Sequence, residues 1–387
     1  TSAQENFSGI RVIKSYVREE SQIDHFTNLS REYLDRNMEK IRIQAMFMPI
    51  MFMIIGLSII VLVLAGGAMV ITGELTLGDI TAFMVYLGYL IWPMIAVGWV
   101  MNIIQQASAS MKRLNAILNE DEEIRDTEKT RYSINGIKGS IKFENVSFKY
   151  KNDLPNVLEN INIEIPCGST VAFVGHTGVG KTTLINMIPR LYDAVEGQVI
   201  IDGINVNEIP LKILRQNIGL VSQETFLFSD TLRNNLLYGA MNGSEDLIEK
   251  VSSISKLNND VEEFPEKYET ILGERGITLS GGQKQRACLA RALAIDPKIL
   301  ILDDSFSAVD THTEEEILTE LKEFMKNRTS IIISHRISTV KNADKIYVLD
   351  EGKVVEEGRH DELISQQGIY ADLHYKQLLE EELKEMS

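Results

Sequence analysis

Charged residues are unevenly spread along the chain, and two long windows contain none of them. Asp, Glu, Lys and Arg are absent from residues 43–73 and again from residues 80–111. An α-helix needs about 20 predominantly apolar residues to cross the hydrocarbon core of a bilayer, so each window is long enough to span a membrane with some tilt. The pattern predicts two membrane helices, with spans at about 44–72 and 80–104 and helical extensions into the cytoplasm.

Basic residues flank the pair of spans but not the link between them. The link, ELTLGD, contains no Lys or Arg, whereas both outer flanks contain several. Positive charge marks the cytoplasmic side of a membrane protein, so both outer flanks are expected inside and the link outside. We therefore expect a multi-pass hairpin in the cell (cytoplasmic) membrane, with the lipid bilayer as a partner. The basic flanking residues are Arg31, Arg36, Lys40, Arg42, Lys112 and Arg113.

The residues ahead of the first span also have a helical pattern. Apolar positions such as Ile10, Ile13 and Val17 recur with helical spacing, which predicts one long helix over residues 1–42 leading into the membrane. The chain starts with Thr1 and has no signal peptide, and a hairpin of two helices offers few surfaces to line a pathway. We expect a fragment with membrane helices missing upstream.

The pattern changes after the second span. Residues 119–138 are rich in charge and predict a linker. From Gly139 onward, short β-type runs alternate with helical stretches, which predicts an α/β domain with a mainly parallel sheet. The predicted organisation is a membrane part at 1–118, the linker at 119–138, and a soluble domain at 139–387 that ends in a helix.

Composition narrows the classes of partner. Acidic residues number 55 and basic residues 39, a formal net charge of −16, whereas nucleic-acid binding needs a basic surface. Nucleic acid is therefore excluded as the main partner, while a nucleotide, which needs only a small local cradle, is not. The two cysteines cannot form a disulfide framework or a zinc site.

A phosphate-binding motif follows a strand-like run in the soluble part. The run TVAFVG leads into GHTGVGKTT, which fits the pattern G-x-x-x-x-G-K-[ST]. The glycines let backbone N–H groups turn towards a phosphate, and the next helix presents its positive N-terminus to the anion. Lys181 is expected to reach the β- and γ-phosphates, and the Thr182 hydroxyl to bind Mg²⁺. The candidate nucleotide-binding residues here are Gly175, Thr177, Gly178, Gly180, Lys181, Thr182 and Thr183.

Two further segments fit a phosphate site. The apolar run KILILDD ends in Asp303 and Asp304, the usual position of the carboxylate that holds Mg²⁺ in P-loop enzymes. Asp303 is therefore a candidate metal ligand. Between the two motifs, LSGGQKQR places Ser280 ahead of two glycines at the start of a helical stretch, which makes a second helix N-terminus suited to an anion.

The ordered set of motifs resembles the nucleotide-binding domain of ATP-binding cassette (ABC) transporters, over residues 140 to about 375. The resemblance implies an α/β P-loop ATPase domain with a helical subdomain, which uses ATP and Mg²⁺. It implies that Tyr150 stacks on adenine, that Gln223 links Mg²⁺ and the attacking water to the membrane part, and that His335 senses the γ-phosphate. Gln223 is thus a second candidate metal ligand beside Asp303.

The resemblance also covers the segments between these residues. LSGGQ is the family signature, and it implies that Ser280, Gly281, Gly282 and Gln283 contact nucleotide. SAVD, residues 307–310, matches the D-loop of the family. ILGERG, ending at Gly276, resembles a short loop of exporters that contacts the cytoplasmic helices of the membrane subunits.

The membrane part resembles the same family. ENFSGIRVIKSYVREE resembles the exporter segment that leads into the fifth of six membrane helices. The two spans would then be the last two helices of a six-helix exporter domain, with the first four absent from this chain. Fusion of spans ahead of the nucleotide domain is typical of exporters, since bacterial importers of the family usually keep the two on separate chains.

Asp304 departs from the family pattern, in which a glutamate at this position polarises the attacking water. Aspartate is one methylene shorter, and misplacing a catalytic group by about 1 Å can cost about 10²-fold in rate. The sequence therefore predicts a site that binds ATP and hydrolyses it slowly. GHTGVGKTT matches the Walker A loop of the family, and Asp303 matches its Walker B aspartate. An intact signature beside a weakened Walker B motif resembles one half of heterodimeric multidrug-type exporters, which implies a partner half-transporter with a Walker B glutamate.

The predicted function is ATP-driven export of a substrate by one half of a dimeric ABC exporter, with Asp304, Gln223 and His335 as the catalytic residues. Two alternatives remain open from the sequence: a homodimeric exporter that uses Asp304 as the base, and a non-transporting ATP-binding subunit with a regulatory or channel-like role. The cargo also stays open among multidrug, lipid, peptide and haem-related export.

Overall fold

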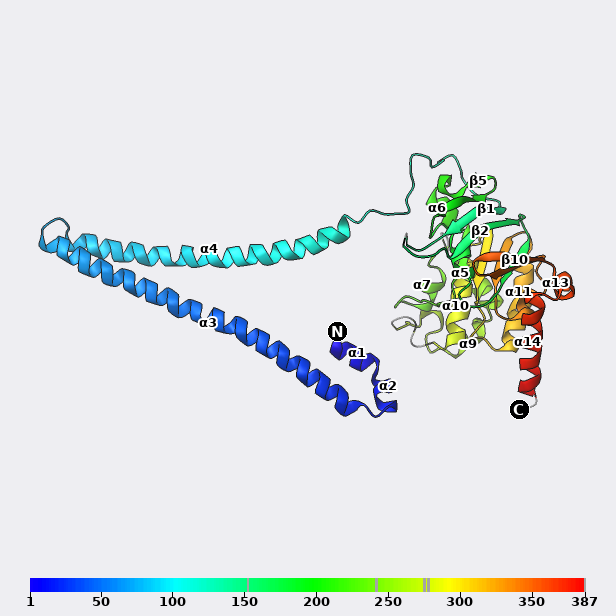
Figure 1. Ribbon diagram of the computed structural model, residues 1–387, viewed down its shortest axis with the longest axis horizontal. Helices are drawn as coiled ribbons and strands as arrows, with labels where there is room; N and C mark the ends of the chain where they lie inside the picture. The colour runs from blue at the N-terminus through cyan, green and yellow to red at the C-terminus, as the bar shows by residue number, and fades with distance from the viewer. Residues whose placement is uncertain (152, 241–242, 274–275, 277–278, 386–387) are drawn as a thin grey trace. The chain divides into compact units, whose positions relative to one another are not determined.

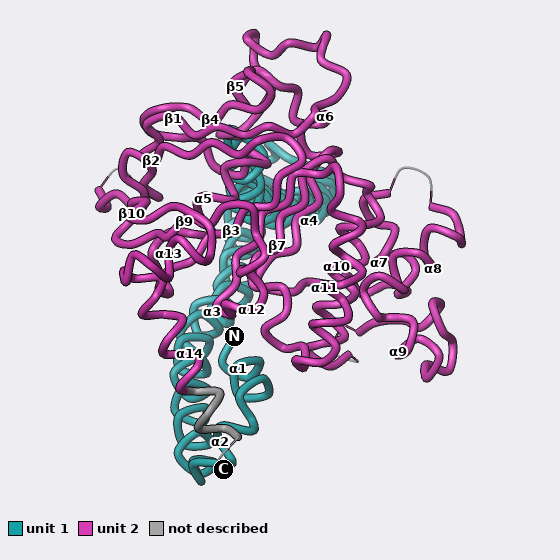
Figure 2. Tube along the Cα trace, turned by 90° about the vertical axis from the view of Figure 1, so that its right-hand side faces the viewer, with its two compact units in different colours: residues 1–121 teal, residues 122–387 magenta. Residues whose placement is uncertain are grey.

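The computed structural model describes residues 1–151, 153–240, 243–273, 276 and 279–385. The chain folds into two compact units, Thr1–Asp121 and Glu122–Ser387 (Figure 2).

The first unit contains a helical hairpin (Figure 1). Its long helices, α3 (Glu19–Ile71) and α4 (Leu77–Leu118), are joined by a short turn that ends at Thr76. Thr76 caps α4: its hydroxyl oxygen accepts from the N–H of Asp79 at 3.3 Å, and the Asp79 carboxylate accepts from the N–H of Thr76 at 2.8 Å. By length and composition both helices could cross a membrane, which agrees with the predicted hairpin.

The residues ahead of α3 do not continue it. They form two short helices, α1 (Ser2–Ser8) and α2 (Ile10–Ser15), so the prediction of one long helix over residues 1–42 is wrong for its first part. Gly9 ends α1, and Val17, with φ at 51°, turns the chain ahead of α3. Phe7 of α1 and Phe26 of α3 line the same hollow, although both side chains stay exposed.

The second unit is built on a six-stranded sheet with the strand order β10-β9-β3-β8-β7-β6. The five strands from β9 to β6 pair in parallel, and β10 pairs antiparallel with β9. The predicted mainly parallel sheet is therefore present. The strands are β3 (Thr170–Val174), β6 (Ile218–Val221), β7 (Ile299–Asp303), β8 (Thr329–Ile333), β9 (Lys345–Asp350) and β10 (Lys353–Gly358).

Both faces of this sheet are buried, which is why its strands read as continuous apolar runs. Alternate residues of one strand belong to different cores: Val171 and Phe173 of β3 lie in one, and Ala172 and Val174 in the other. The first core is shared with an antiparallel sheet, and the second with helices. The sheet is thus the middle layer of the unit.

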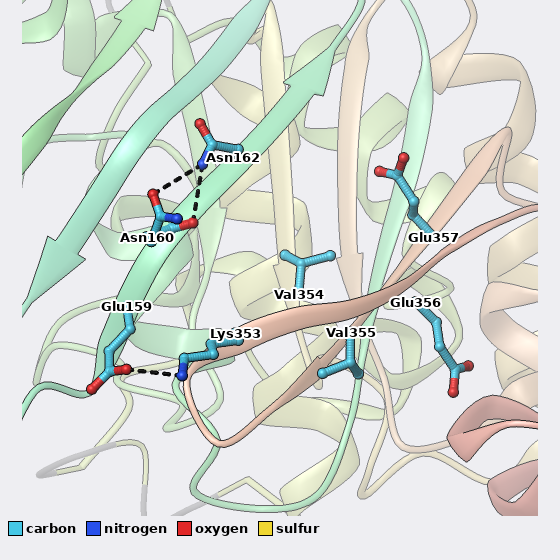
Figure 3. A pocket seen from close by; sticks show the side chains of 8 residues that line it. All are labelled: Glu159, Asn160, Asn162, Lys353, Val354, Val355, Glu356 and Glu357. Carbon is cyan, nitrogen blue, oxygen red and sulfur yellow. Dashed lines mark hydrogen bonds and ion pairs between the residues drawn. The ribbon is translucent and has the colours of Figure 1, made fainter.

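The antiparallel sheet has the order β2-β1-β4-β5 and was not predicted from the sequence. Its edge strand β2 lies beside β10 of the other sheet, where the N–H of Glu159 donates to the carbonyl of Gly352 at 2.9 Å. Lys353 and Glu159 form an ion pair at 3.1 Å across the groove between these strands (Figure 3). The strands are β1 (Ile141–Phe148), β2 (Leu158–Ile165), β4 (Glu196–Ile201) and β5 (Ile204–Asn205).

Helices cover the sheets, and a group of them (α7 to α10) forms the expected helical subdomain. The helix α10 of the signature segment contacts α7 and α8. The helices are α5 (Lys181–Asn186), α6 (Leu211–Gln216), α7 (Leu232–Leu236), α8 (Glu245–Ile254), α9 (Asn258–Glu263), α10 (Gly281–Ala294), α11 (Thr311–Met325), α12 (Ile337–Val340), α13 (His360–Gln366) and α14 (Ile369–Glu385), with 3-10 turns at Val206–Glu208 and Lys267–Glu269.

The segment between α4 and β1 consists of turns and bends, and from Asp126 onward it packs on the rest of the second unit. The Asp126 carboxylate accepts from the N–H of Leu211 at 3.0 Å. Arg131 pairs with Glu208 at 2.5 Å, and Ile137 is buried. The chain is therefore anchored to the second unit well before β1 begins.

Candidate functional site

The glycine-rich loop lies between β3 and α5, where only glycine fits at two positions. Gly175 has φ at 148°, and a Cβ there would lie 2.2 Å from the carbonyl oxygen of Leu349. Gly180 has φ at 98°, and a Cβ there would lie 2.8 Å from the side chain of Leu158. The loop can therefore pack closely against the neighbouring strands while its backbone stays open to a phosphate.

Lys181 is folded into this loop. Its Nζ donates to the carbonyl oxygens of Gly175 at 2.7 Å and of His176 at 2.8 Å, and the residue is buried. Burial lowers the pKa of the Lys181 ammonium, while the carboxylates of Asp303 and Asp304 act against that shift. The loop thus encloses a positive charge, which suits a phosphate.

Thr182 and Asp303 meet at the end of β7. The Thr182 hydroxyl donates to the Asp303 carboxylate at 2.8 Å, and Asp303 is buried. Burial raises the pKa of Asp303, and the hydrogen bond from Thr182 partly offsets this. A hydroxyl and a carboxylate are oxygen ligands of the kind that Mg²⁺ prefers, and a buried carboxylate with a raised pKa is stabilised by a cation. The residues present therefore fit Mg²⁺.

The carboxyl edge of the parallel sheet brings the other predicted residues to the same place. The neighbouring strands β3, β8, β7 and β6 all end there, and ligands bind at this edge in open α/β sheets. His335 follows β8 and Gln223 follows β6, while Asp303 ends β7 and Asp304 follows it. Strand pairing thus gathers residues that are far apart in the sequence.

These residues line one cavity of about 320 Å³. Gly175 is not among its lining residues, because it lies at the end of β3 against Leu349. Of the predicted residues, the cavity is lined by Tyr150, Thr177, Gly178, Gly180, Lys181, Thr182, Thr183, Gln223, Asp303, Asp304 and His335.

Asp304 has an unusual backbone conformation in this cavity. Its φ is 45°, in the left-handed region, and its N–H donates to the carbonyl of Ile333 at 2.9 Å. Aspartate is among the residues that tolerate this conformation best. The backbone at the position expected for the catalytic carboxylate is therefore fixed by a hydrogen bond to the neighbouring strand β8.

Tyr150 stands at the edge of the cavity and is 51% exposed. Its hydroxyl lies 2.8 Å from the hydroxyl of Thr183, and its ring makes edge contacts with Phe148 and Tyr192. Thr183 is thus hydrogen-bonded to the expected adenine-binding residue. The exposed ring offers an aromatic surface to a flat base.

The signature residues lie elsewhere, at the N-terminus of α10. Ser280 caps this helix, accepting from the N–H of Gln283 at 3.3 Å, and the Gln283 side chain accepts from the N–H of Ser280 at 2.9 Å. None of Ser280, Gly281, Gly282 and Gln283, all of which the structure describes, lines the cavity. A single chain therefore does not bring the signature to its own glycine-rich loop.

The glycines of the signature let α10 approach the D-loop. A Cβ at Gly282 would lie 2.9 Å from the carbonyl oxygen of Ala308. Sequence reasoning missed Gln285, whose amide donates to the Ser307 hydroxyl at 2.8 Å and accepts from the N–H of Ala308 at 2.9 Å. In the sequence, only the position of Gln285 in the first turns of the signature helix pointed to a contact with the D-loop.

Two other contact residues were missed, Glu314 and Gln377, which both contact the segment around His335. Glu314 follows the D-loop and reads as an ordinary first-turn acid, and Gln377 lies in a charged C-terminal helix without a motif. The predicted exporter loop ILGERG falls partly outside the described residues, at 274–275.

Comparisons with known proteins agree with both parts of the chain. Residues 1–94 match the family model of the ABC transporter transmembrane region, and residues 158–307 match the ABC transporter model. An uncharacterised ABC transporter ATP-binding protein of Bacillus subtilis, YknU, is 41% identical over 97% of this chain and 65% of its own length. The ATP-dependent lipid A-core flippase of Syntrophus aciditrophicus is 39% identical over 100% of this chain and 64% of its own length.

A third relative, the multidrug resistance-like ATP-binding protein MdlA of Escherichia coli, is 38% identical over 97% of this chain and 63% of its own length. Among solved structures, that of a bacterial Atm1-family ABC exporter with ATP bound has a TM-score of 0.89 and 30% identity, covering 97% of this chain and 66% of the other. The chain thus spans slightly less than two thirds of the length of the curated relatives it matches.

Proposed function

Since the chain belongs to the ABC transporter family and has the exporter arrangement of a transmembrane region fused ahead of a nucleotide-binding domain, we propose that it is one half of a dimeric exporter that hydrolyses ATP to move a substrate across the cytoplasmic membrane. The nucleotide-binding unit would lie in the cytoplasm. The whole exporter would contain further membrane helices besides α3 and α4.

One observation carries this proposal: a single cavity combines the glycine-rich loop, Lys181 and the polar ends of three other parallel strands. Phosphoryl transfer depends mainly on positioning and on stabilising charge at the γ-phosphate. Lys181 and the loop backbone would hold the β- and γ-phosphates, and Tyr150 would contact the base. His335, which lines the same cavity, would contact the γ-phosphate.

Thr182, Asp303 and Gln223 would hold Mg²⁺, which neutralises charge on the phosphates when bound. The Thr182 hydroxyl and the Asp303 carboxylate are already paired. Gln223 lies at the end of β6 on the cavity wall, so its amide could also orient the attacking water and connect the cavity to the segment that follows it.

We propose that Asp304 makes this Walker site only weakly hydrolytic. General base catalysis contributes typically about 10²–10⁴-fold, and Asp304 reaches one methylene less far than glutamate from a backbone that is fixed to Ile333. The partner would then be a different half-transporter that carries a Walker B glutamate. If the exporter is a homodimer instead, Asp304 must act as the base.

The signature would serve the partner's nucleotide. Because Ser280 and Gly282 lie outside this chain's own cavity, a head-to-tail pair of nucleotide-binding units would let the N-terminus of α10 meet the γ-phosphate held by the partner. Each ATP would then join the two chains, and its hydrolysis would release them. This closing and opening would switch the access of the attached membrane helices.

The cargo is best supported as a multidrug-type or lipid substrate, because relatives at this level of identity are named as a multidrug resistance-like protein and as a lipid A-core flippase. The Met-rich first span, with Met46, Met48, Met51 and Met53, is compatible with a plastic apolar surface. Peptide and haem-related cargo have no such support among the relatives compared.

The proposal is tested by purifying the tagged full-length chain from its own cells in mild detergent and identifying co-purifying proteins by mass spectrometry. A second half-transporter with a Walker B glutamate and an altered signature would support the heterodimer. Recovery of this chain alone would contradict it and favour the homodimer. ATP hydrolysis by the purified complex in lipid vesicles, lost when Lys181 and the corresponding lysine of the partner are both replaced by alanine, tests the ATPase activity itself.

A further inference from the structure

The C-terminal helix reaches the segment that carries His335 through one side chain, Gln377. The side-chain oxygen of Gln377 accepts from the N–H of Ile337 at 2.8 Å, and its amide nitrogen donates to the carbonyl of His335. A primary amide can accept and donate at once, so one side chain satisfies two main-chain groups on either side of Arg336. The main chain at His335 is thereby tied to α14.

The helix that presents Gln377 is itself fixed to the unit. The Glu356 carboxylate of β10 accepts from the N–H groups of Ile369 at 2.5 Å and Tyr370 at 3.2 Å, which caps the start of α14. Tyr370 is completely buried, and its hydroxyl lies 2.8 Å from His360. Gln377 follows Tyr370 by seven positions and so lies on the same face of the helix.

The His335 segment is also held from α11. Glu314, which is 3% exposed, forms an ion pair with Arg336 and accepts from the Thr339 hydroxyl at 2.6 Å. Two elements therefore fix the residues that follow His335, while the His335 side chain remains on the cavity wall. The contact from α11 sets the start of α12, and the contact from α14 acts on the main chain of His335 itself.

We propose that Gln377 is a positioning residue that holds His335 against the terminal phosphate, so that the C-terminal helix sets how well this site distinguishes ATP from ADP. The inference rests on the proposed function, because it requires nucleotide in the cavity beside His335. Without Gln377, two main-chain groups lose their partners and the imidazole is no longer held in place. Binding of the loop and Lys181 to the phosphates common to ATP and ADP is unaffected.

The test compares Gln377→Met with the wild-type chain in the assembled full-length transporter. Methionine has a similar length and suits a helix, but it cannot make either hydrogen bond. The matched control is Lys376→Ala, at the exposed neighbouring position of α14. An azido-ATP photolabel is cross-linked on ice, the chains are separated by gel electrophoresis, and the labelling of this chain is competed with ATP or with ADP in the presence of Mg²⁺.

We expect Gln377→Met to weaken competition by ATP about tenfold, the effect of losing one hydrogen bond to a charged group, while competition by ADP stays the same. Hydrogen–deuterium exchange of the peptide covering residues 334–340 should become faster in this variant only. Equal weakening for ATP and ADP would mean a structural role and would overturn the inference, as would unchanged ATP competition.

Labelling of the wild-type chain tests the proposed nucleotide site separately from the role of Gln377. If it is labelled and distinguishes ATP from ADP, the proposed nucleotide site holds and the variant decides the role of Gln377. If it does not distinguish them, the role proposed for His335 is wrong and the inference falls with it. Unchanged exchange of residues 334–340 in Gln377→Met would also overturn the inference, independently of any nucleotide.

Discussion

Replacing Asp304 with glutamate should speed ATP hydrolysis at this chain's own Walker site. The change adds one methylene, about 1.5 Å of bond length, to a carboxylate whose backbone is fixed by the hydrogen bond from its N–H to Ile333 at 2.9 Å. The main chain therefore cannot move forward to make up for the shorter side chain. Since about 1 Å of misplacement costs about 10²-fold, we expect an increase of roughly 10- to 100-fold.

The same position predicts a cost in stability. Asp304 has φ at 45°, and the left-handed region is less favourable for glutamate than for aspartate, by up to about 1 kcal/mol. Asp304→Glu should therefore lower the melting temperature of the transporter by a few degrees. A faster rate of ATP hydrolysis together with a lower melting temperature in Asp304→Glu would indicate that aspartate at this position favours stability over hydrolysis.

The assay is ATP hydrolysis in lipid vesicles by the complete transporter, with the partner's own catalytic carboxylate replaced by an amide so that only this site contributes. Asp304→Asn is the control, because it keeps the size of the side chain and removes the base. A rate for Asp304→Glu equal to that of the wild-type chain, with ATP binding retained, would refute the reasoning. A measurable wild-type rate that Asp304→Asn abolishes would show that Asp304 is a working base.

Three further predictions concern the signature, the metal ligand and the cysteines. Gly282→Ala should slow turnover of the assembled transporter at least tenfold while ATP photolabelling of this chain is unchanged, because the new Cβ would lie 2.9 Å from the Ala308 carbonyl and must push the helix off the D-loop. Burial raises the pKa of Asp303, so the Asp303 carboxylate binds a proton more tightly in the folded, ligand-free site than in the unfolded chain. The affinity for Mg²⁺-ATP should therefore fall as the pH drops through this raised pKa. Titration calorimetry should show this fall in the wild-type chain and not in Asp303→Asn. Burial also raises the pKa of the Cys288 thiol, whereas Cys167 is exposed; mass spectrometry after brief treatment of the native protein with iodoacetamide at mildly alkaline pH should find Cys167 modified and Cys288 intact.

Local patterns carried most of the correct predictions. The two charge-free windows, the strand-loop-helix order at Lys181 and the apolar strand ending in Asp303 depend only on residues that are close in the sequence. Their periodicity and spacing reflect local backbone geometry, so they can be read without knowing the fold. The cap at Ser280 belongs to the same class, because its partner Gln283 is three residues away.

Two features of the fold were predicted wrongly or not at all: the break in the helix over residues 1–42 and the antiparallel sheet. Residues 1–42 have a continuous helical period, yet α1 ends at Gly9, and Val17, with its positive φ, turns the chain ahead of α3. The antiparallel sheet was missed because its pairing is irregular: β1 carries register shifts in its pairings with β2 and β4.

The sequence by itself determined that the chain has two membrane-type helices, a phosphate-binding loop, and a set of family motifs that includes an aspartate at the position of the usual glutamate. Only the tertiary structure decided which residues meet. The order β3-β8-β7-β6 places His335, Asp303 and Gln223 at one edge, and the folding of α14 back onto the unit places Gln377 against His335. These contacts join residues tens to more than a hundred positions apart. They arise because parallel strands pair through backbone hydrogen bonds and buried helices pack by their faces, and no local spacing specifies either arrangement.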